Sequence, residues 1–179
     1  LNGTDGLGNA VSLTTTTDAS GNYSFSVPPG SYTVDEDCPA GWRQSYPGPT
    51  TSEAGCGNNT YAITLTSQEV DSDNNFGNFR NATKSGVKYH DLNANGQQDA
   101  GEPGLTAWTI NATATGGSAV SASTTTGAGG SYSLSLTPGS YDVGEVCPAG
   151  QGWRQSQPGP VTDAAHCGDN KYSITLISQ

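Results

Sequence analysis

The sequence predicts an all-β fold, organised as two tandem β-sandwich modules, and three observations support this prediction. Only 32% of the 179 residues are hydrophobic, and they occur in short runs in which apolar and polar side chains alternate, as in strands with one buried face. The chain has 25 glycines and 10 prolines, which separate these runs as turn residues do. The third observation is an internal repeat, and no stretch carries apolar residues at helical spacing.

Most of the chain is present twice. Residues 19–40, ASGNYSFSVPPGSYTVDEDCPA, match residues 128–149, AGGSYSLSLTPGSYDVGEVCPA, at an offset of 109 positions. After a two-residue insertion at Gln151, residues 56–68 match residues 167–179 at an offset of 111. A long self-similar segment of this kind indicates two units with the same fold.

The segment between the two copies is unique. Residues 69–109 occur only once in the chain. We therefore expect the boundary between the modules near Asn81–Lys84. The first module then spans 1–80 and the second spans 81–179.

Short strands are predicted in order along the second copy. In SYSLSLT, Tyr132, Leu134 and Leu136 share one face and serines occupy the other, because successive side chains of a strand point to opposite faces. KYSITLIS alternates in the same way, with Tyr172, Ile174 and Leu176 on one face. The predicted strands of this copy are 85–90, 105–114, 119–126, 131–137, 140–147 and 171–178, and the first copy is expected to repeat those that it shares.

The four cysteines are predicted to form two disulfides. Four cysteines allow three pairings, and the repeat favours Cys38 with Cys56 and Cys147 with Cys167, because similar modules should be bridged alike. A zinc site is the alternative, but no pair of cysteines or of cysteine and histidine has zinc-finger spacing. Disulfides place the protein outside the cytosol.

Residues 91–102, DLNANGQQDAGE, match the calcium-loop pattern D-x-N-x-N-G-x5-E at every fixed position. Gly96 would make the turn, and the oxygens of the other positions would surround one Ca²⁺ ion. The alternative is a turn rich in Asn and Asp, which favour turns without any ion. The predicted ligands are Asp91, Asn93, Asn95, Gln97 (through its main-chain carbonyl), Asp99 and Glu102, and the ion is expected to be structural.

Three stretches together resemble a known family: 85–110, SGVKYHDLNANGQQDAGEPGLTAWTI; 140–153, SYDVGEVCPAGQGW; and 74–79, NNFGNF. They resemble the B-type repeat domains of serine-aspartate repeat adhesins of bacterial surfaces, which are similar to collagen-adhesin B domains. The resemblance implies an immunoglobulin-like sandwich of reversed, prealbumin-like topology, used as a stalk. It also implies that the loop after the first strand binds calcium without flanking helices.

Some domains related to this family carry a Lys–Asn isopeptide bond assisted by an acidic residue. Glu36 and Glu145 resemble that acid by their sequence context. Strand alternation, however, is expected to point Tyr89 rather than Lys88 inward, so no isopeptide bond is predicted. The paired cysteines would take over its bracing role.

The resemblance also implies that the first and last strands of a module are neighbours. The first copy has the last strand, 74–79, and lacks the first strand; the second copy has the first strand, 86–90, and lacks the last. Each module is therefore expected to have an open sheet edge, which can pair with another strand. The chain is then either a fragment of a longer tandem array or a protomer that polymerises head to tail with copies of itself.

Several sequence features bear on location and modification. The net charge of −10 and the six Lys and Arg residues argue against nucleic-acid binding, and no apolar run is long enough to insert into a membrane. The chain starts at Leu1 without a signal-like segment, so we expect a mature product or a fragment. N-x-S/T sequons mark five possible glycosylation sites: Asn2, Asn22, Asn58, Asn81 and Asn111.

The sequence favours a secreted structural protein over an enzyme. His90 and His166 do not recur in the other copy, and no nucleophile elbow, phosphate loop or zinc-protease motif is present. The alternative function is a carbohydrate- or protein-binding adhesin module, in which Trp42 or Trp153 of the repeated GWRQS would stack on a sugar. The competing interpretation is that these tryptophans close the end of the sandwich beside the disulfide.

Overall fold

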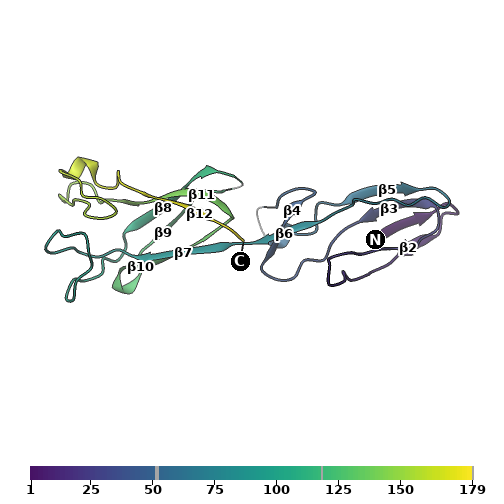
Figure 1. Ribbon diagram of the computed structural model, residues 1–179, viewed down its shortest axis with the longest axis horizontal. Coiled ribbons are helices and arrows are strands. Elements are labelled where there is room, and N and C mark those ends of the chain that lie inside the picture. The colour runs from purple at the N-terminus through teal and green to yellow at the C-terminus, as the bar shows by residue number, and fades with distance from the viewer. Residues whose placement is uncertain (51–52, 118, 179) are drawn as a thin grey trace. The chain divides into compact units, whose positions relative to one another are not determined.

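The computed structural model describes residues 1–50, 53–117 and 119–178. In this part of the chain, β-strands are joined by turns and short 3-10 segments, without an α-helix. The strands form antiparallel sheets, so the predicted all-β immunoglobulin-like class is confirmed. The chain divides into two compact units, module 1 (Leu1–Phe79) and module 2 (Arg80–Gln179), and each is described by itself (Figure 1).

Module 1 has one four-stranded sheet in the order β2-β1-β3-β5 and a separate pair, β4-β6. Tyr32 of β3 lies opposite Gly3 of β1 and Ile63 of β5, which places it at the centre of the sheet. The elements are β1 (Asn2–Asp5), β2 (Ala10–Ser12), β3 (Gly30–Val34), β4 (Trp42–Tyr46), η1 (Glu53–Gly55), β5 (Tyr61–Leu65) and β6 (Gly77–Arg80).

Module 2 repeats this sheet as β12-β11-β8-β9 and has a different pair, β10-β7. Within it, Tyr141 of β11 lies opposite Ala114 of β8 and Ile174 of β12. The elements are β7 (Ala82–Val87), β8 (Thr109–Gly116), β9 (Ala122–Thr125), η2 (Ala128–Gly130), β10 (Ser131–Leu136), β11 (Gly139–Val146), η3 (Ala164–His166) and β12 (Tyr172–Leu176).

The core of module 2 lies between β10 on one side and β8 and β11 on the other. The predicted inward faces are observed: Leu134 and Leu136 are buried, and Ile174 and Leu176 pack against the cluster. Tyr141 is fully buried, and its hydroxyl donates to the carbonyl of Thr137 (2.8 Å). The buried cluster is Trp108, Ile110, Ala112, Leu134, Leu136, Tyr141 and Val143.

Module 1 has a smaller buried cluster, consisting of Leu1, Tyr32 and Val34. Partly buried aromatic rings extend it: Tyr23, Phe25, Tyr61 and Phe76. Phe76 lies just before β6, and its ring meets that of Tyr61 edge-on, with 5.3 Å between the ring centroids. The last strand of module 1 is therefore anchored in the core by an aromatic side chain.

Each module has a two-stranded sheet beside its four-stranded one, and the two modules form this second sheet from different strands. In module 2, β10 pairs with β7, whereas residues 153–157 form no strand. In module 1 the counterpart of 153–157 is β4, which pairs with β6, whereas residues 23–27, the counterpart of β10, form no strand. The expectation that both copies repeat the strand at 131–137 is wrong. The physical reason is that a strand needs a neighbour, and the described part of module 1 offers 23–27 no counterpart of β7.

Candidate calcium site and disulfide braces

The candidate calcium loop connects the two sheets of module 2. Residues 91–102 lie between β7, which belongs to one sheet, and β8, which belongs to the other. The base of the loop is closed by a bridge between Tyr89 and Gly104 and by a hydrogen bond from the His90 N–H to the carbonyl of Pro103 (2.8 Å). The loop is therefore carried by extended backbone on both sides.

Asp91 organises the first half of the loop. Its Oδ2 accepts from the N–H of Gly96 (2.8 Å), and its Oδ1 accepts from the N–H of Asn95 (3.2 Å). Burial acts to raise the pKa of Asp91, but the hydrogen bonds from Gly96, Ser156 and Asn95 outweigh it and hold the pKa below its usual value. The side chain is therefore a carboxylate at neutral pH. Gly96 adopts a φ of 78°, which only glycine tolerates without strain.

Three side chains of the loop converge on one point. The Nδ2 groups of Asn93 and Asn95 each lie 2.8 Å from the same Oδ2 of Asp99. The Oδ1 atom of Asn93 accepts from the N–H of Asn95 (3.0 Å). The segment therefore gathers amide and carboxylate oxygens, which are the hard-oxygen donors that Ca²⁺ requires.

Glu102 closes the loop from its far end. Its side chain is 9% exposed, and its two oxygens accept from the N–H groups of Leu92 (2.8 Å) and Asp99 (3.0 Å). Gln97 takes part through its backbone, whose N–H donates to Oδ1 of Asn95 (2.7 Å). The predicted ligands thus lie within one loop, and their carboxylate, amide and main-chain oxygens are of the kind that Ca²⁺ prefers.

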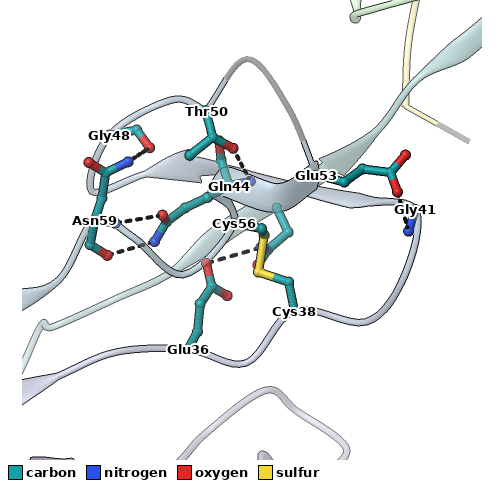
Figure 2. Close-up of a disulfide and its surroundings, with 10 residues drawn as sticks. Glu36, Cys38, Gly41, Gln44, Gly48, Thr50, Glu53, Cys56 and Asn59 are labelled. Carbon is teal, nitrogen blue, oxygen red and sulfur yellow. Dashed lines mark hydrogen bonds between the residues drawn. A yellow bond between two sulfur atoms is a disulfide. The ribbon is translucent and has the colours of Figure 1, made fainter.

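Both predicted disulfides are confirmed. Cys38 is bonded to Cys56 and Cys147 to Cys167, each with 5.8 Å between the Cα atoms, and the first bridge lies beside Glu36 (Figure 2). A carboxylate and two cysteine sulfurs also meet in module 2, at Glu145. Because the sulfurs are bonded to each other, these groups are not zinc sites.

Each module also contains a buried glutamine, Gln44 or Gln155, that the sequence did not lead us to expect. Gln44 is fully buried; its amide donates to the carbonyl of Asn59 (2.9 Å) and accepts from the N–H of the same residue (3.1 Å) (Figure 2). Gln155 makes the same pair of bonds with Asn170 (2.8 and 3.2 Å). The signal was available, because WRQS is repeated unchanged in both copies.

Lys88 points inward, so the expectation that Tyr89 would take its place is wrong. The Nζ atom of Lys88 lies 2.8 Å from Oε2 of Glu145, whose side chain is 6% exposed, and 4.8 Å from the ring centroid of Trp108. Val87, the preceding residue, is 46% exposed. The physical reason is that a buried carboxylate and an aromatic face together stabilise the ammonium group inside the module.

The tryptophan of the second GWRQS packs into the end of module 2. The ring of Trp153 meets Trp108 edge-on at 5.2 Å and His90 edge-on at 5.0 Å, and it packs against the buried cluster. An inward-packed ring offers little face for stacking on a sugar. The geometry therefore favours the structural role for Trp153.

The five sequon asparagines differ in accessibility. Asn2, Asn22 and Asn58 are exposed, whereas Asn81 and Asn111 are half-buried. The Oδ1 atom of Asn81 is buried and its Nδ2 donates to Ser135 (3.0 Å). Glycosylation therefore suits Asn2, Asn22 and Asn58 better than the other two.

Reduction of the disulfides is expected to destabilise each module separately. The bridges close loops with sequence separations of 18 and 20 residues, so each loss should cost about 3 kcal/mol of unfolding free energy. Serine replacement of Cys147 and Cys167 should lower the transition of module 2 only, and the same change at Cys38 and Cys56 that of module 1 only. Denaturant unfolding measures this, and two unchanged transitions would contradict it.

In the described part of the chain, no helix is both long and apolar enough to cross a membrane.

No solved structure matches the chain. Among curated proteins, Colossin-A of Dictyostelium discoideum is 32% identical over 177 residues. That alignment covers 97% of this chain but 2% of Colossin-A.

A second comparison concerns protein families. The sequence matches the family described as SdrD B-like domain over residues 86–176. The match spans more than half of the chain, from β7 to the end of β12. It includes the candidate calcium loop and the Cys147–Cys167 bridge. The chain therefore belongs to the SdrD B-like domain family.

Proposed function

We propose that this protein is a secreted structural repeat protein, forming an extracellular stalk or a head-to-tail filament that calcium and disulfides make rigid. The observation that carries the proposal is the bracing of each thin sandwich: each module contains one disulfide, and in module 2 the candidate calcium loop joins the two sheets. Small modules with little core gain most from such braces.

Three further observations support an extracellular structural role. Disulfides persist in oxidising surroundings, and three sequon asparagines are exposed to a glycosylating enzyme. The SdrD B-like family is one of adhesin-type domains rather than of enzymes. The alignment with Colossin-A covers nearly the whole chain but a small part of the relative, as expected of a unit from a repeat array.

The filament form of the proposal rests on the open edge of β7, which has one neighbouring strand, β10, among the described residues. Such an edge can pair with a strand of another molecule. The test is electron microscopy of the purified chain at high concentration with calcium. Filaments are expected. If only dispersed monomers are seen, the filament form is overturned, and the stalk of a longer array is the form that remains.

Calcium is expected to stabilise module 2 and to order residues 91–102. At a concentration tenfold above the dissociation constant, the ion adds about 1.4 kcal/mol of unfolding free energy, and extracellular modules bind calcium with constants of about 0.1–1 mM. Titration calorimetry and melting curves in about 10 mM calcium, against excess chelator, measure both effects.

The loop and module 1 supply matched variants for this experiment. Glu102→Gln removes one carboxylate of the set and keeps an oxygen for one of its two backbone N–H partners, and it should abolish the calcium-dependent shift. Asp18→Asn changes the single carboxylate of a turn in module 1, where Asp18 accepts from the N–H groups of Ser20 and Asn22, and should leave the shift unchanged. An identical melting temperature with calcium and with chelator would sink the calcium proposal.

A further inference from the structure

Module 1 shows how the last strand of a module is held. The hydroxyl of Tyr23 donates to the carbonyl of Asn74 (2.5 Å), and that of Tyr61 donates to the carbonyl of Asn75 (2.6 Å). The ring of Phe76 lies against both tyrosines, with centroid distances of 6.2 Å and 5.3 Å. Two tyrosines therefore hold both the backbone and the side chain of the strand that leads into β6.

The next two residues of this strand fit equally closely. A Cβ atom on Gly77 would lie 2.9 Å from Oγ of Ser45, so the strand approaches β4 closely enough that a side chain here would force the hydroxyl to move. The Nδ2 of Asn78 donates to Oε1 of Glu36 (3.1 Å) and lies 3.5 Å from Sγ of Cys56. Burial raises the pKa of Glu36, and the hydrogen bond from Asn78 partly offsets this.

Module 2 contains the same set of groups, but its described residues provide no such strand. Tyr132 and Tyr172 are the repeat counterparts of Tyr23 and Tyr61, and Glu145 is that of Glu36. They line a cavity of about 70 Å³ together with residues 87–89 and 155–158. Tyr172, at the mouth, is 43% exposed.

The groups inside this cavity lack the partners that module 1 supplies. Apart from the ion pair with Lys88, neither oxygen of Glu145 accepts a hydrogen bond among the described residues. The ammonium of Lys84 lies 6.0 Å from the ring centroid of Tyr132 and 5.9 Å from that of Tyr172. In module 1, the corresponding tyrosines contact the ring of Phe76 instead.

We propose that this cavity, bounded by residues 87–89 and 155–158, is a docking groove for an extended strand with the chemistry of residues 74–78. The strand would place a phenylalanine between Tyr132 and Tyr172, a glycine beside residues 153–157 and an asparagine amide on Glu145. Its backbone would pair with the open edge of β7. Residues 153–157 would become a strand, as β4 is in module 1.

The inference deepens the proposed function, because a neighbouring repeat is the source of such a strand in a stalk or filament. The groove itself does not depend on polymerisation. If the chain binds the strand but stays monomeric in electron microscopy, the groove proposal stands and the filament proposal is overturned.

The probe is a synthetic peptide of residues 74–80, NNFGNFR, added to the full chain. Saturable binding is expected, followed by tyrosine fluorescence or calorimetry. Peptides with Phe76→Ala or Asn78→Ala should bind at least about tenfold more weakly, since each loses an aromatic contact or a hydrogen bond to a carboxylate. No saturable binding to a chain shown to be folded by circular dichroism would overturn the proposal.

Variants of the chain locate the binding. Tyr172→Ser opens the groove at a partly exposed position, so that folding is retained, and it should weaken binding about tenfold. Val120→Ser alters a residue that is 56% exposed and does not line the cavity, and binding should be unchanged. Equal affinities for the Tyr172→Ser and unaltered chains would place the peptide elsewhere and overturn the proposal.

Hydrogen exchange distinguishes the possible occupants. Protection gained at residues 85–89 and 153–157 on adding the peptide supports the groove. Protection in module 1 instead would mean that the peptide only displaces the chain's own β6, and would overturn it. Concentration-dependent protection of 85–89 without peptide would show that a second copy covers this edge by another surface, and would also overturn it.

Discussion

Replacing Lys88 by methionine is expected to destabilise module 2 by about 3–5 kcal/mol, the usual cost of leaving one partner of a buried ion pair alone. The Lys88 and Glu145 side chains are 18% and 6% exposed, and their charged atoms are 2.8 Å apart. Without the ammonium, neither oxygen of the Glu145 carboxylate has a polar partner among the described residues. Urea unfolding of the module 2 transition measures the loss.

Two variants control for the loss of packing. The double variant Lys88→Met with Glu145→Gln removes both charges and should recover most of the stability, because the pair as such contributes little net free energy. Glu36→Gln in module 1 changes a carboxylate whose partner is the neutral amide of Asn78, and should have a smaller effect. If the single and double variants at Lys88 were equally unstable, the ion pair would not be the cause.

Truncation of Tyr141 to alanine is expected to cost about 3–5 kcal/mol, as for other large buried rings. Its side chain is fully buried at the centre of the sheet, and its hydroxyl bonds to the carbonyl and the hydroxyl of Thr137 (2.8 and 2.9 Å). Tyr141→Phe keeps the ring and loses these bonds, so it should cost about 1–2 kcal/mol.

The repeat supplies a matched variant in the other module. Tyr32 is 3% exposed, and its hydroxyl donates to the carbonyl of Pro28 (2.7 Å). Tyr32→Ala should lower the transition of module 1, and Tyr141→Ala that of module 2, when the unfolding of each module is followed by hydrogen exchange. If either substitution lowered the unfolding transitions of both modules, the modules would not unfold separately.

The sequence predicted the fold class and the disulfides because both follow from local or repeated signals. Alternation identified the inward residues Leu134, Leu136 and Ile174, and the repeat paired Cys147 with Cys167. These signals do not require knowledge of which strands become neighbours.

The failures concern neighbours that are distant in sequence. Residues 23–27 have the alternation of a strand, but without a counterpart of β7 they form none. Lys88 was expected to face solvent because strand alternation predicts that Tyr89 points inward instead. Its partner Glu145 lies more than fifty residues away, beside the Cys147–Cys167 bridge. The candidate calcium loop could be proposed from the sequence because all its donors lie within one short segment, and it stays a prediction.

The positions of the two bridges also determine how far each module can lengthen when it is pulled by its ends. The sequence separations are 18 and 20 residues, so each covalent closure withholds about 60–70 Å of contour from stretching. With both disulfides intact, the unfolded chain would therefore extend less far under tension. Reduction of the disulfides would add the withheld length.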